Sequence, residues 1–177
     1  WYDAKKQSAD MTVTAEPRHS AHSYSFAGEA ARALFDRTKD ISWAEKWYDA
    51  KKQSADMTVN TEPLHSAHAY SFAGNAARAV FDKTGDISWA KKWYYTYKQS
   101  ADMTVTAEPR HSAHSYSFAG NAAKALSNAT RNISWTERAI DCYQKFLSYY
   151  EINPNPRMDA VIHRIGNDVI FLQGFVR

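Results

Sequence analysis

The chain has 177 residues, of which 44% are hydrophobic, 23% charged and 14% aromatic, as in a globular protein with a packed core. Its formal net charge of +3 is too small to indicate a nucleic-acid-binding protein on electrostatic grounds alone. No apolar run approaches the ~20 residues of a membrane-spanning helix, and the lone cysteine, Cys142, excludes an intramolecular disulfide.

Cys142 is expected to be a buried core thiol. No cationic and apolar leader opens the sequence, so a cytoplasmic location is the default expectation.

The dominant feature is an internal repeat with a period of 46 residues. Residues 1–46 and 47–92 differ at nine positions, nearly all of which exchange one surface-type side chain for another. The copies diverge after Trp135, but Gly28, Gly74, Gly120 and Gly166 keep the spacing of 46. The tail from residue 139 is therefore interpreted as a fourth, altered unit, as is common at the end of a stacked array.

The repeat predicts a single array over residues 1–177. Its parts are the second helix of a truncated unit (1–16), three helical hairpins (17–62, 63–108 and 109–154) and a divergent C-terminal helix (155–177). Because Trp1 aligns with the middle of a helix in later copies, we expect a piece of a longer array.

The first helix of each unit is predicted to begin near Pro17, Pro63 or Pro109, since proline suits the first helical turn. Small or apolar residues then recur at spacings of three and four, which indicates a helical stripe. In the second copy these are Ala69, Phe72, Ala73, Ala76 and Val80.

A turn at Lys39-Asp40 or Gly85-Asp86 is predicted to lead into the second helix, which runs roughly over residues 42–58 in the first copy. Ser42 or Ser88 is the expected cap. Large aromatic residues on the second helix would face small residues on the first, so that each hairpin completes its core by stacking on the next.

These motifs resemble the tetratricopeptide repeat. Its pattern of a large residue, an apolar residue three positions later and then glycine is matched by Tyr24…Ala27-Gly28, Tyr70…Ala73-Gly74, Tyr116…Ala119-Gly120 and Ile162…Ile165-Gly166. The turn Gly85-Asp86-Ile87, the pairs Ala44…Tyr48 and Ala90…Tyr94, and the stretch 138–147 followed by Asn153-Pro154 also resemble the family. The unit of 46 residues exceeds the family's usual 34 and is similar to its longer variants.

The resemblance implies an all-α superhelical solenoid of antiparallel helix pairs, with the first helices lining a concave groove that binds a peptide or protein segment. Its groove positions lie six and three residues before the repeated glycine and one and four after it, on one helical face. They are His22, Ser25, Glu29, Arg32, His68, Ser71, Asn75, Arg78, His114, Ser117, Asn121 and Lys124, continued by Asn167. Their polar, mildly basic chemistry suits an acidic segment or a free C-terminus, although copied solvated surface would look the same.

Paired histidines begin each first helix: His19/His22, His65/His68 and His111/His114. Their spacing of three could place two imidazoles on one metal ion, and their titration could make binding sensitive to pH. No carboxylate or cysteine recurs beside them at the spacing of a third ligand, although a stacked neighbour could supply one. They are interpreted as polar helix-start residues, and we expect no metal site and no cofactor.

The tryptophans at 43, 47, 89, 93 and 135 could stack on nucleic-acid bases, but their helical spacing favours the core. The aspartates at 10, 40, 56, 86 and 102 fall at predicted turns or helix ends, where they are expected to be caps. No phosphate-binding loop, Ser-His-Asp set or paired acid site is recognisable, so an enzyme is not expected.

A protein–protein interaction scaffold is thus the expected function, and no membrane partner is expected. Self-association through an unpaired apolar face at residues 1–13 is an alternative. So is an engineered array without a natural ligand, because the copies are nearly identical. A helical repeat that reads nucleic acid is a third possibility and would bind with a strong salt dependence.

Overall fold

A computed structural model describes residues 1–176 of the chain. Within that range every regular element is helical: α1 (Tyr2–Thr12), α2 (Pro17–Thr38), α3 (Ile41–Thr58), α4 (Pro63–Thr84), α5 (Ile87–Thr104), α6 (Pro109–Thr130), α7 (Ile133–Ile152), the 3₁₀ turn η1 (Pro156–Met158) and α8 (Asp159–Val176). Each helix packs against the next along the chain. The predicted fold class is confirmed: the protein is an all-α solenoid of helical hairpins.

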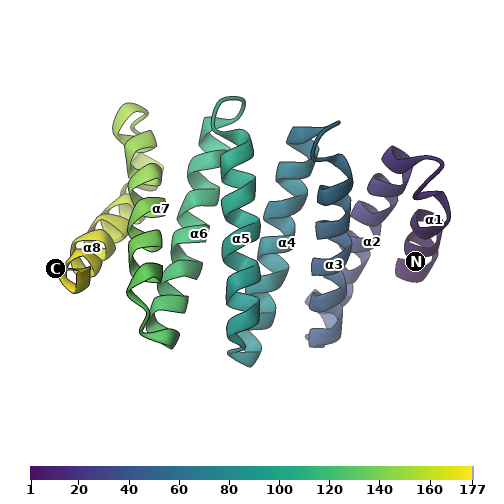
Figure 1. Ribbon diagram of the computed structural model, residues 1–177, viewed down its shortest axis with the longest axis horizontal. Coiled ribbons are helices and arrows are strands. Elements are labelled where there is room, and N and C mark those ends of the chain that lie inside the picture. The colour runs from purple at the N-terminus through teal and green to yellow at the C-terminus, as the bar shows by residue number, and fades with distance from the viewer. Residues whose placement is uncertain (177) are drawn as a thin grey trace.

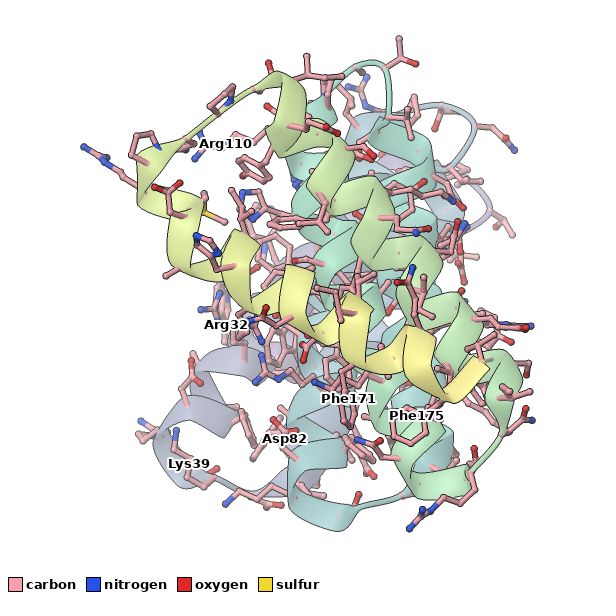
Figure 2. All side chains as sticks on the ribbon, turned by 90° about the vertical axis from the view of Figure 1, so that its left-hand side faces the viewer. Arg32, Lys39, Asp82, Arg110, Phe171 and Phe175 are labelled. Atoms are coloured by element: carbon pink, nitrogen blue, oxygen red, sulfur yellow. The ribbon has the colours of Figure 1, made fainter. Side chains whose placement is uncertain are left out.

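The hairpins form two layers (Figure 1). In the view of Figure 1, α1, α3, α5 and α7 lie in front of α2, α4 and α6, and the two ends of the chain lie at opposite ends of the long axis. The last helix, α8, crosses the end of the array obliquely, as Figure 2 shows end-on. We call the surface formed by α2, α4 and α6 the first-helix face.

Local sequence explains where the first helices begin and end. Each starts with a proline in its first turn, as predicted. Each is followed by a residue in the left-handed conformation, whose backbone N–H bonds to the carbonyl four residues earlier. These residues are Lys39, Gly85 and Arg131.

The second helices are capped by Asp40 and Asp86, as expected for these two aspartates, and not by Ser42 and Ser88. The side chains of Asp40 and Asp86 accept hydrogen bonds from the backbone N–H of Ser42 and Ser88, at 3.0 and 2.8 Å. Asn132 does the same at the start of α7. The serines are thus donors within the first turn, because the helix begins one residue earlier than expected.

The remaining aspartates are not helix caps, which corrects the expectation for Asp10, Asp56 and Asp102. They lie on α1, α3 and α5 and accept a hydrogen bond from a tyrosine of the following first helix. The Tyr70 hydroxyl, for example, lies 2.6 Å from the Asp56 carboxylate. These bonds join each second helix to the next unit.

The core consists of aromatic rings interlocked with small residues, as predicted. Trp47 and Trp93 are buried, and edge-to-face pairs such as Tyr48–Trp89, with centroids 5.2 Å apart, join successive second helices. Cys142 is fully buried, and burial raises the pKa of its thiol to about 12. The indole rings of Trp47 and Trp93 are therefore not free to stack on bases.

Candidate functional site

The predicted groove positions lie on α2, α4, α6 and α8, and most retain exposed surface. Ser117 is the exception: it is buried, and its hydroxyl donates to the carbonyl of His114 at 2.8 Å. In the end-on view of Figure 2, Arg32 lies on the same side of the array as Arg110, a residue that the sequence analysis did not select.

A hollow of about 590 Å³ lies on the first-helix face between α4 and α6, with α5 behind it. Its lining combines polar groups with two aromatic rings: Ser71, Asn75, Tyr97, Glu108, Arg110, His111, His114, Ser115 and Phe118. Three of these residues, Ser71, Asn75 and His114, were predicted groove positions. The equivalent hollow between α2 and α4 measures about 210 Å³.

The predicted asparagines are held by tyrosines that reach through from the second helices. Tyr97 donates its hydroxyl to Oδ1 of Asn75 at 2.7 Å, and Tyr143 donates to Asn121 at 2.9 Å. Since the carbonyl oxygen of each amide faces its tyrosine, the amide N–H₂ group is the end left for a ligand. The site thus offers oriented hydrogen-bond donors to a ligand.

The first unit replaces this pair with an ion pair. Lys51 stands where the later units have tyrosine, and its ammonium lies 2.7 Å from Glu29 and 2.9 Å from the hydroxyl of Ser25. Lys51 is buried, with only 3% of its side chain exposed, and burial lowers its pKa while Glu29 opposes that shift. Glu29 is therefore engaged within the protein.

The basic residues of the first-helix face differ in whether a carboxylate already pairs with them. Lys124 forms an ion pair of 2.6 Å with Asp168, which ties α6 to α8. Arg78 lies 3.3 Å from Asp82 on an exposed surface, where such pairs are weak. Arg110 is exposed and lines the larger hollow. It lies four residues before His114, which is about one helical turn. Extending the series of groove positions by one turn would therefore have included Arg110.

The histidines meet across units and not within one helix. The His22 ring packs on His65 with centroids 4.8 Å apart, and the His68 ring packs on His111 at 4.4 Å. Glu108, directly before the proline of α6, lies 2.9 Å from Nε2 of His68. A carboxylate does therefore recur beside the imidazoles. Its sequence signal was the glutamate before each helix-starting proline, 46 residues apart.

Burial disfavours the charged form of several of these imidazoles. The pKa values of His65, His111 and His114 are all lowered, in each case mainly by desolvation. The third interface has a different partner, because Nε2 of His114 lies 2.8 Å from the hydroxyl of Tyr150 on α7. Neutral rings can serve as hydrogen-bond acceptors or metal ligands.

No known family model matches this chain, and a search of the curated proteins finds no significant match. Among residues 1–176, none of the helices combines the length and the apolar character needed to cross a membrane.

Proposed function

We propose that this protein is an interaction scaffold of the long tetratricopeptide type, which binds a peptide or protein segment along the first-helix face. The observation that carries this proposal is the hollow of about 590 Å³ between α4 and α6, because predicted groove residues from two units line it together. A concave site of this size, with a few placed polar groups over an aromatic floor, suits the side chains of a docked segment.

The chemistry of the hollow favours a segment rich in hydrogen-bond acceptors. The amide of Asn75 presents its N–H₂ group, and Arg110 supplies a guanidinium at the upper rim. Arginine can bind a carboxylate through two parallel hydrogen bonds. Phe118, stacked on Tyr97 with centroids 4.9 Å apart, forms an apolar floor. We infer that the preferred ligand carries acidic side chains or a free C-terminal carboxylate next to an apolar residue.

A peptide array tests the proposal. The wild-type chain is screened against acidic, neutral and C-terminal peptides beside the triple variant Asn75→Ala/Arg78→Ala/Asn121→Ala and the single variant Arg110→Ala. We expect each to lose at least ~10-fold in affinity for acidic or C-terminal peptides, since each removes donors to the ligand.

The matched control is Lys91→Ala/Glu137→Ala, which changes exposed residues on α5 and α7, in the other layer. This variant should bind like the wild type. Equal binding by the control and the groove variants would discard the first-helix face as the binding site.

A further inference from the structure

The interface between α4 and α6 brings two imidazoles and one carboxylate together. One ligand atom each from His68, Glu108 and His111 lies within 4.8 Å of the other two. Four-coordinate zinc places its nitrogen and oxygen ligands about 3.3 Å apart, from bond lengths near 2.0–2.1 Å. Small side-chain rotations can therefore close this set around an ion without moving the helices.

Two of these side chains, Glu108 and His111, are also positioned for that role. Glu108 is the N-cap residue of α6, but its side chain accepts no backbone hydrogen bond there, so the carboxylate remains free to bind elsewhere. The hydroxyl of Ser100 on α5 lies 3.0 Å from Nε2 of His111 and orients that ring. Outer hydrogen bonds of this kind hold metal-binding histidines in place.

The preceding interface has the same residue types but a different electrostatic environment. There, Glu62 forms an ion pair with Arg18, whose Nε lies 2.5 Å from Oε1, and His22 is 3.5 Å from the carboxylate. The buried Lys51 also lines the same hollow as His65. Both cations oppose a bound divalent ion.

At the α4–α6 interface neutral residues stand at the positions of these two cations. Leu64 stands at the repeat position of Arg18, and Tyr97 stands at that of Lys51. Among residues 1–176, Glu108 is left with His68 as its side-chain partner, with Nε2 of the ring 2.9 Å from the carboxylate. Two of the substitutions between the copies therefore replace a cation near this cluster by a neutral residue, and the cation that remains in the lining of the hollow is the exposed Arg110, which stands at the repeat position of Leu64.

We propose that His68, Glu108 and His111 bind a divalent first-row transition-metal ion, for which Zn²⁺ fits best, and that the ion links α4 to α6. Two imidazoles and one carboxylate, with a fourth position for water or a ligand, form a known zinc donor set. Glu108 and His111 line the hollow of about 590 Å³, so the fourth position would open into it. The site does not depend on peptide binding.

Isothermal titration of the untagged chain with ZnCl₂ tests this proposal. We expect one site with a dissociation constant in the micromolar range, about −8 kcal/mol at 1 μM. His68→Ala, Glu108→Gln and His111→Ala should each weaken it at least ~100-fold, since loss of a ligand costs more than loss of an outer partner. The Co²⁺ form should show the intense visible absorption of tetrahedral coordination.

Two variants make the test specific to this interface. His22→Ala, the matched change in the preceding interface, should leave zinc affinity unchanged. Leu64→Arg recreates the arginine of that interface at a partly exposed position and should weaken binding at least ~10-fold. Circular dichroism verifies that each variant is folded. Wild-type binding weaker than ~1 mM, full binding by Glu108→Gln, or equal losses in His22→Ala and His68→Ala would overturn the proposal.

Discussion

At the scale of single residues, the repeated glycine allows two helices to approach closely. A Cβ atom at Gly120 would lie 2.5 Å from the ring of Tyr143, whereas a Cβ at Gly166 would meet nothing within 4 Å. We expect Gly120→Ala to lower the free energy of unfolding by ~1–3 kcal/mol through overpacking. Gly166→Ala should raise it by ~0.5–1 kcal/mol, because alanine is the better helix former. Urea unfolding measures both, and similar values for the two would contradict this account.

The exchange of Asn75–Tyr97 for Glu29–Lys51 indicates that each pair changes as a unit. Glu29→Asn leaves the buried ammonium of Lys51 without its carboxylate, and we expect a loss of ~1–3 kcal/mol in unfolding free energy. The double variant Glu29→Asn/Lys51→Tyr recreates the pair of the next unit above Gly28 and should recover most of the loss. Thermal unfolding followed by circular dichroism measures the stability of the wild type and of both variants. A double variant no more stable than Glu29→Asn would show that the pairs are not coupled.

At the scale of secondary-structure elements, the turns between the helices of a hairpin differ in strain. Lys39 and Arg131 adopt φ values of 58° and 55°, whereas the equivalent position in the second hairpin is Gly85, at 68°. Lys39, labelled in Figure 2, lies at the exposed end of α2. We expect Lys39→Gly and Arg131→Gly to stabilise the protein by ~0.5–1 kcal/mol each and Gly85→Lys to destabilise it by a similar amount. Melting temperatures that shift in the same direction in all three variants would refute this explanation.

Helix positions could be predicted from the sequence because their signals are local. Proline starts each first helix, and the 46-residue period repeats the pattern. Contacts between units could not be predicted in the same way. Whether His68 meets His65 on its own helix or His111 on the next depends on how far adjacent hairpins are staggered, and that distance is not encoded in one helix. For the same reason, the local sequence indicates a cap at Asp56 and does not reveal its hydrogen bond with Tyr70 of the next unit.

At the scale of the whole molecule, buried tyrosines make the array sensitive to high pH. Burial raises the pKa values of Tyr24, Tyr48 and Tyr94 from 10.0 to about 12. A group whose pKa is raised on folding contributes its full stability below pH 10 and loses that contribution as the pH rises towards 12. We expect tyrosinate absorbance and loss of helicity to develop together over this range. Ionisation of these tyrosines near pH 10 with the helices intact would contradict the assigned burial.

The array also contains an internal control for the effect of stacking on stability. Residues 2–12, which form α1, have the same sequence as residues 48–58 of α3. Their intrinsic amide exchange rates are therefore equal apart from end effects, but α1 packs mainly on α2, whereas α3 packs between α2 and α4 (Figure 1). In a stacked array, stability comes from the interfaces with neighbours, and regions with few packed contacts open most readily.

We therefore expect amides in residues 2–12 to exchange at least ~10-fold faster than those in 48–58. Hydrogen exchange with mass spectrometry measures this difference, and peptides that extend one turn further can be told apart because Thr14 is replaced by Asn60. Equal protection of the two segments would mean that each helix is stabilised by its own sequence. Faster exchange in the first segment would locate the difference in what each copy packs against, since the residues themselves are the same.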